Sequence, residues 1–210
     1  MNRIVKDTII LTVITLVAGV LLGLVYEVTK DPIAVQKELK KQEAYKTVFS
    51  DAEKFEEMSD TEEASAKALV DGGFNSADAE KASIVINETM KALDAGGNVL
   101  GYAMNITTSE GYGGDITFTL GIRNDGTVNG YEILSISETA GLGMKAKEDA
   151  FKQQFAGKKV DSFAYTKTGA SADNEIDAIS GATITTKAMT GAINAGLCWF
   201  QTLEGGGVNE

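Results

Sequence analysis

The chain has 210 residues, of which 43% are hydrophobic and 23% are charged, and these fractions are typical of a folded protein rather than a disordered one. Its 19 Lys and Arg and 30 Asp and Glu give a net charge of -11, which repels nucleic acid and argues against a nucleic-acid-binding role. The chain has no His and one Cys, Cys198, so it lacks Ser–His and Cys–His pairs and cannot hold an iron–sulfur cluster alone. Any redox chemistry therefore requires an organic cofactor.

The amino-terminal segment 8–26 is uncharged and strongly apolar. At ~1.5 Å rise per residue it spans about 28 Å as a helix, close to the ~30 Å hydrocarbon core of a bilayer. A cleaved signal peptide is the alternative, but the exit from the apolar run, 23–28, has no small-x-small cleavage site. We expect residues 1–28 to form a single transmembrane anchor that contacts membrane lipid.

The positive charges indicate the orientation of this anchor. Arg3 and Lys6 precede the apolar segment, and no basic residue follows it until Lys30. The positive-inside rule therefore places the amino terminus in the cytoplasm and the remainder of the chain on the extracytoplasmic side, although Lys37, Lys40 and Lys41 weaken the contrast.

Residues 29–82 are expected to form a helical connector. Asp31-Pro32 should end the anchor or bend the chain, since proline disfavours the helical conformation of the residue before it. Residues 33–49 have the composition of an amphipathic helix. Residues 50–82 are acidic and rich in Ala, as in a solvated helix and loop.

The pattern in residues 83–204 predicts one domain of the α+β class, with an antiparallel sheet and flanking helices. Residues 83–89 and 99–107 flank a turn and predict a hairpin, and strict alternation in 116–123 predicts a strand that returns after Asp125-Gly126 as 128–137. Helices are expected at 145–155 and 184–203. The glycine-rich residues 205–210 are expected to be a flexible tail.

The segment Asp177–Thr183 places small and hydroxyl residues just before the last predicted helix. The unpaired N–H groups and partial positive charge of a helix amino terminus can hold a phosphate. Gly181 and Ala182 allow close approach of a ligand, and Ser180, Thr183 and Thr186 supply hydroxyls. The same pattern also fits an ordinary helix cap.

Two further glycine-rich segments are candidate ligand loops. Residues 138–144 (Glu-Thr-Ala-Gly-Leu-Gly-Met) follow a predicted strand, and 111–114 (Gly-Tyr-Gly-Gly) precede one. Glycines at strand ends are typical of ligand-facing loops but equally of plain turns or bulges. In the ligand interpretation, the ring of Tyr112 is available for stacking.

Taken together, these segments resemble a known family. Residues 177–183 fit the flavinylation pattern D-x-x-[ST]-G-A-T, and with the anchor, 29–33, 111–116 and 138–143 the chain resembles the G subunit of the Rnf electron-transport complex. It is also similar to the C subunit of the sodium-pumping NADH:quinone oxidoreductase. The resemblance covers nearly the whole chain. One departure is Ala140, where the family loop usually has proline.

The resemblance implies a covalently bound flavin mononucleotide (FMN). A separate flavin transferase would join the FMN phosphate to Thr183 by a phosphoester bond. Two groups of residues would then line the cofactor: Ser180, Gly181, Ala182 and Thr186 at the phosphate, and Glu138, Thr139, Leu142 and Gly143 at the ring, with Leu142 on its face. No catalytic side chain and no metal ligand is implied, and Cys198 is expected to be a buried structural thiol.

The implied function is that of an electron-carrier subunit in an ion-translocating ferredoxin:NAD oxidoreductase complex. The chain would act as an enzyme only within that complex, with the other Rnf subunits as partners. The alternative from a different class is an extracytoplasmic, non-redox module that binds a phosphorylated ligand reversibly, as a sensor does.

Overall fold

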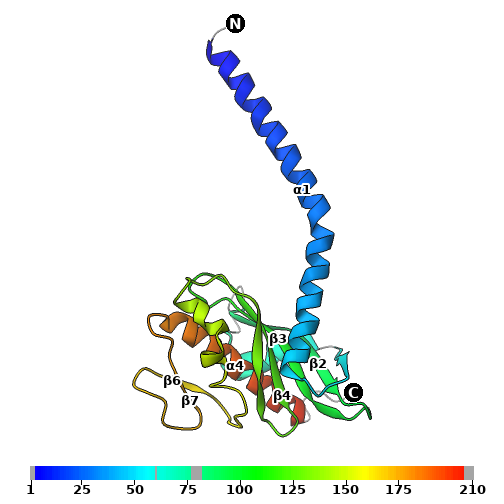
Figure 1. The fold of residues 1–210 in the computed structure, drawn as a ribbon, viewed down its shortest axis with the longest axis vertical. Helices are drawn as coiled ribbons and strands as arrows, with labels where there is room; N and C mark the ends of the chain where they lie inside the picture. The colour runs from blue at the N-terminus through cyan, green and yellow to red at the C-terminus, as the bar shows by residue number, and fades with distance from the viewer. Residues whose placement is uncertain (1–2, 60, 77–81, 206–210) are drawn as a thin grey trace. The chain divides into compact units, whose positions relative to one another are not determined.

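The fold is that of a computed structural model, which describes residues 3–59, 61–76 and 82–205. The chain divides into two compact units, Met1–Lys40 and Lys41–Glu210. The order of elements in the described residues is helix α1, strand β1, helix α2, strands β2 to β5, two short helices, strands β6 and β7, and helix α4 (Figure 1).

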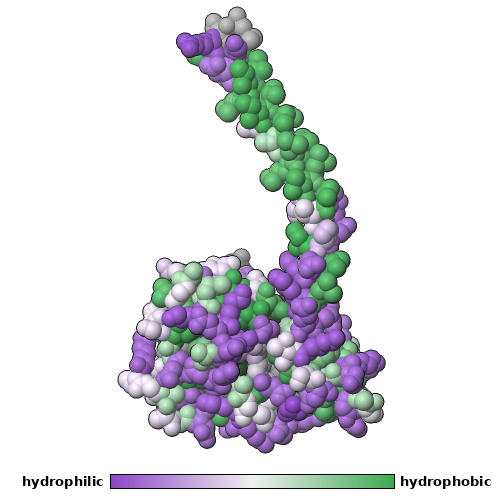
Figure 2. All heavy atoms as spheres, in the orientation of Figure 1, coloured by the Kyte–Doolittle hydropathy of each residue, from purple (hydrophilic) through white to green (hydrophobic). Residues whose placement is uncertain are grey.

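Helix α1 (Arg3–Val48) contains the predicted membrane span. Its apolar window has a mean hydropathy of 2.7 and none of it is buried, so the helix is long and apolar enough to cross a membrane. Figure 2 shows this run of apolar side chains along the helix. The expectation that Asp31-Pro32 ends the helix is wrong, because α1 continues through Pro32. A proline removes one helical hydrogen bond, and the helix-forming residues on both sides keep the helix intact here.

The folded unit is built on an antiparallel five-stranded sheet with the order β1-β2-β3-β4-β5. Its strands are β1 (Lys54–Glu57), β2 (Ile84–Leu93), β3 (Val99–Thr108), β4 (Ile116–Arg123) and β5 (Val128–Ser135). The α+β class, the hairpin of β2 and β3 and the alternation in β4 are confirmed. Ile116, Phe118, Leu120 and Ile122 are all fully buried on one face of the sheet.

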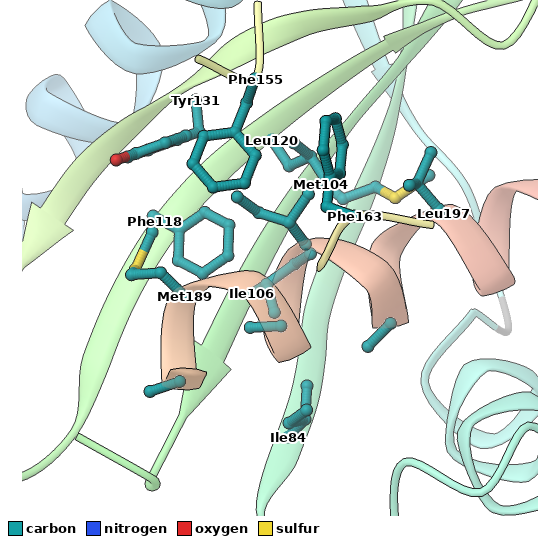
Figure 3. Close-up of a cluster of buried hydrophobic side chains, with 14 of the residues drawn as sticks. Ile84, Met104, Ile106, Phe118, Leu120, Tyr131, Phe155, Phe163, Met189 and Leu197 are labelled. Atoms are coloured by element: carbon teal, nitrogen blue, oxygen red, sulfur yellow. The ribbon is translucent and has the colours of Figure 1, made fainter. Parts of the chain in front are cut away.

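Helix α4 (Thr183–Glu204) packs against that face and forms the main core with it. Figure 3 shows side chains of β3 and β4, including Ile106 and Leu120, beside Met189 and Leu197 of the helix. Gly196 permits the close contact, since a Cβ there would lie 2.5 Å from Leu120 Cδ2. Helix α2 (Thr61–Asp71) packs on β2 and α4.

A second, smaller cluster covers part of the opposite face of the sheet. The end of α1 and the following residue contribute Tyr45, Val48 and Phe49, which pack with Met90, Ala92 and Ala103. Glu88 Oε2 accepts hydrogen bonds from Lys41 Nζ at 2.8 Å and Tyr45 OH at 2.9 Å. The last turns of α1 are therefore part of the folded unit.

Several local expectations need correction. Residues 50–82 are not a helix and loop alone, because β1 pairs with β2 at their start. The helix expected at 145–155 is two short pieces, the 3-10 helix η1 (Gly143–Lys147) and α3 (Asp149–Lys152). The parallel pair β6 (Ala164–Thr166) and β7 (Glu175–Asp177) was not expected. The predicted flexible tail falls, from residue 206 on, outside the described residues.

Candidate functional site

Three segments that are distant in the sequence meet at one cavity of about 560 Å³. This volume lies within the range of about 300–1,000 Å³ that is usual for small-molecule and cofactor sites. Eight of the ten predicted site residues line it: Tyr112, Glu138, Thr139, Leu142, Gly143, Gly181, Ala182 and Thr183. Ile184 and Thr185 also line it and were not predicted. Both residues directly follow the motif in the first turn of the helix, and this position could have predicted that they line the cavity.

The start of α4 forms one wall of the cavity. Thr183 is the first helical residue and follows Ala182, whose backbone lies outside the helical region (φ -133°, ψ 50°). The first N–H of the helix with an internal partner is that of Thr186, which donates to Ala182 O at 3.0 Å. Within the described residues, no side chain caps this end. The N–H groups of residues 183–185 are thus available to an anion, which the positive end of the helix dipole also favours.

The other two predicted site residues, Ser180 and Thr186, do not line the cavity. Thr186 is buried, and its hydroxyl accepts a hydrogen bond from Ile179 N–H at 3.0 Å and donates one to Ala182 O at 2.9 Å. It therefore closes the loop that precedes the helix. Ser180 is exposed on the outside of this loop.

Glycines allow the three segments to approach one another closely. A Cβ at Gly143 would lie 2.5 Å from Thr185 Oγ1 and 2.6 Å from Glu138 Oε2. Gly181 has a φ of +75°, which a residue with a side chain rarely adopts, and a Cβ there would lie 3.0 Å from Leu142 Cδ2. In this structure, Gly143 and Gly181 thus allow close contacts between the segments that line the cavity.

The carboxylate of Glu138 holds the first glycine-rich segment in place. Its Oε1 accepts hydrogen bonds from the backbone N–H groups of Tyr112 at 2.7 Å and Gly113 at 3.3 Å. The residue is only 8% exposed. Because hydrogen bonds to a carboxylate are stronger than neutral ones, this contact fixes Tyr112 beside residues 138–143.

The loop after Glu138 turns tightly so that one apolar side chain faces outward. Gly141 has a φ of +75°, and the N–H groups of Leu142 and Met144 both donate to Thr139 O. Leu142 is 41% exposed as a result. Ala140 occupies an exposed position in this turn, so the absence of the usual proline leaves the turn intact.

Exposed apolar side chains of the folded unit gather at this cavity. Tyr112 is 71% exposed and Ile184 52%, and with Leu142 they line it from its three segments. Among the described residues 41–205, Tyr165, at 38%, is the one other exposed large hydrophobic residue. An apolar lining beside uncapped backbone N–H groups suits a ligand with a flat apolar ring and an anionic end.

Two other residues considered in the sequence have structural contacts. Asp177 Oδ1 accepts a hydrogen bond from Ala170 N–H at 2.7 Å and so fixes the loop between β6 and β7. Cys198 is half-buried, and burial raises the pKa of its thiol, with a smaller contribution from the charge of Asp71. No group of three or more potential metal ligands occurs within the described ranges.

Comparison with known proteins supports the interpretation of this cavity. Residues 111–197 match the model of the FMN-binding domain, and residues 1–48 match the RnfG N-terminal region. The G subunit of the proton-translocating ferredoxin:NAD(+) oxidoreductase complex of Clostridium ljungdahlii is 30% identical over 98% of this chain and 96% of its own length. The chain belongs to the RnfG family, the G subunits of ion-translocating oxidoreductase complexes.

Another member of the RnfG family, from Methanosarcina acetivorans, is 30% identical over 97% of this chain and 98% of that relative. Among solved structures, the C subunit of the Na(+)-translocating NADH-quinone reductase of Parabacteroides distasonis is 26% identical, with a TM-score of 0.48 over 56% of this chain and 62% of that one. The match to the FMN-binding domain includes all three segments that line the cavity.

Proposed function

We propose that this RnfG family member carries electrons within a membrane-bound, ion-translocating ferredoxin:NAD oxidoreductase complex, through an FMN attached to Thr183. The observation that carries the proposal is the position of Thr183, which opens α4 and lines the cavity within the matched FMN-binding domain. The names of the relatives support the larger assembly, because one is the G subunit of a proton-translocating ferredoxin:NAD(+) oxidoreductase complex and the other is the G subunit of an ion-translocating oxidoreductase complex.

The residues at the cavity fit FMN in three respects. The uncapped start of α4 offers N–H groups to a phosphate, and the side chain of Thr183 is partly exposed beside them. The exposed side chains of Tyr112, Leu142 and Ile184 offer apolar contact to a ring. The volume of about 560 Å³ is sufficient for a ligand of this class.

Attachment requires Thr183 to act as the acceptor of a phosphoryl group. A flavin transferase would form a bond between Thr183 Oγ1 and the phosphorus of FMN while the bond from that phosphorus to its leaving-group oxygen breaks, and the departing group would take up the proton of the hydroxyl. The chain then gains the mass of FMN less one water. Thr185 is nearby but almost fully buried, so its hydroxyl is a poorer acceptor.

When bound, the flavin supplies the oxidation and reduction, which ordinary side chains cannot perform. The start of α4 would hold its phosphate end, and Leu142 and Tyr112 would contact its ring. The covalent bond would prevent loss of the cofactor. We also propose that α1 anchors the protein with its amino terminus in the cytoplasm and the flavin on the extracytoplasmic side, as the charges around the span favour.

The experiment is intact-protein mass spectrometry of the full chain produced with a flavin transferase. The native chain should gain the mass of FMN less water and keep its yellow colour after denaturation. Thr183→Ala should abolish both, and Thr185→Ala should retain them. A Thr183→Ala chain that still carries covalent flavin would place the attachment elsewhere, and a flavin that dissociates from the denatured native chain would favour the reversible binding module.

A further inference from the structure

Glu138 is unusual among the charged residues of this protein. In the described part of the chain it is the one buried Asp, Glu, Lys or Arg, at 8% exposure. No Lys or Arg of that part forms an ion pair with it within 4.0 Å. A buried charge without a counter-ion is costly and is retained mainly where it serves a function.

The two oxygens of this carboxylate have different surroundings. Oε1 is bound by the backbone N–H groups of Tyr112 and Gly113. Oε2 has no hydrogen-bond partner among the described residues, although it is not fully enclosed by protein. It lies close to Gly143, where a Cβ would be 2.6 Å from it, and both Glu138 and Gly143 line the cavity.

We propose that Glu138 sets the reduction potential of the flavin. The proposal rests on the function proposed above, and in it the charge of Glu138 acts on the flavin through space. A negative charge in a buried, low-dielectric wall opposes the arrival of further negative charge more strongly than it would in water. The carboxylate should therefore lower the potential and favour a flavin that gives electrons away.

The proposal also explains why a carboxylate holds the loop 111–114. A neutral Gln at the same position could accept the same two N–H bonds through its amide oxygen. The loop contact thus does not require a charge, whereas the effect on the potential does. The two roles can be separated by removing the charge and keeping the shape.

The test is a spectroelectrochemical titration of the full chain carrying covalent flavin, in its native form and as Glu138→Gln. We expect the substitution to increase the ratio of reduced to oxidised flavin at a fixed applied potential by at least tenfold, which corresponds to about 30 mV for a two-electron couple. Asp115→Asn is the matched control. It removes the same charge from an exposed residue that follows the same loop and does not line the cavity, and it should leave the ratio unchanged.

Thermal unfolding of the same proteins separates the alternatives. A lower melting temperature of Glu138→Gln with an unchanged potential would overturn the proposal and leave Glu138 with a structural role only. If Glu138→Gln fails to fold or to retain flavin, Thr139→Lys replaces it. This variant adds a positive charge at the same wall, keeps Glu138, and should raise the potential, and an unchanged value would overturn the proposal.

The failure of the proposed function would be visible before any titration. A native chain without the flavin absorbance would contradict the electron-carrier role itself, and this inference would fall with it. If the native chain binds flavin but the native protein, Glu138→Gln and Asp115→Asn have equal potentials, only the role of Glu138 is contradicted.

Discussion

Gly143 and Thr185 approach so closely that a Cβ on the glycine would lie 2.5 Å from the threonine hydroxyl. This contact joins the loop after β5 to the first turn of α4 and thereby closes one side of the cavity. It depends on the absence of a single methyl group. The contact therefore provides a direct test of whether the cavity is the flavin site.

Gly143→Ala should impair flavin attachment. The added methyl would also lie 2.6 Å from Glu138 Oε2, so the loop after β5 must move away from the start of α4, and such overpacking costs about 1–3 kcal/mol of stability. The measurements are covalent flavin content and the free energy of unfolding. The matched control is Gly191→Ala in α4, where nothing lies within 4 Å, and which should increase stability by about 0.5–1 kcal/mol with normal flavin content. Normal flavin content in Gly143→Ala would contradict the arrangement.

Thr186→Val should lower stability and slow flavin attachment without changing the attachment site. The hydroxyl of Thr186 joins Ile179 N–H to Ala182 O, and its removal leaves both backbone groups without this partner in a buried position. The expected loss is about 1–3 kcal/mol, measured by chemical denaturation. Mass spectrometry of peptides should still find the flavin on Thr183. A stability equal to that of the native chain would show that the loop does not need this bond.

Trp199→Phe should destabilise the core through one lost hydrogen bond. Trp199 Nε1 donates to Thr89 Oγ1 at 3.1 Å, and both residues are fully buried. The expected cost is about 1–3 kcal/mol in the free energy of unfolding, because Thr89 is left unpaired and the smaller ring leaves space. The double variant with Thr89→Val should cost less than the sum of the two single variants. Additive costs would show that the bond contributes nothing.

Tyr131 should make stability decrease at high pH. Burial raises the pKa of its phenol far above the usual value of 10.0, with a small contribution from Glu132, and its OH donates to Ala146 O at 2.6 Å. The folded chain keeps this proton when the unfolded chain loses it, so the contribution is complete below about pH 10 and declines above that pH. Tyr131→Phe should flatten the fall in stability between about pH 10 and 12. An unchanged slope would assign the fall to other groups.

The sequence predicted the parts of the fold that have a regular period. The alternation in β4 indicated which side of the strand is buried, because one face of it meets the core. Strand β1 could not be predicted in this way, since Lys54–Glu57 contains one apolar residue and owes its conformation to pairing with β2. The sequence did not predict that α1 continues through Pro32, because proline disfavours the helical conformation of the residue before it and therefore often marks the end of a helix.

Most of the candidate site could be predicted because three short contiguous motifs supply it. Two predicted residues are exceptions: Ser180 lies on the outside of the loop before α4, and the side chain of Thr186 points away from the cavity in the first turn of the helix. A helix rotates by about 100° per residue, so Thr185 reaches the cavity while the next residue turns into the loop. A motif gives the order of residues along the chain, whereas this difference depends on where the helix begins.

In the proposed FMN site, the phosphate would be held by backbone amides at the start of α4, in a chain that contains no histidine. Amide N–H groups neither gain nor lose protons in the biological range of acidity. Hydrogen-bond donors of this kind do not change their charge when the medium around the protein becomes more acidic or more alkaline. This property is useful to a protein whose complex moves ions across a membrane.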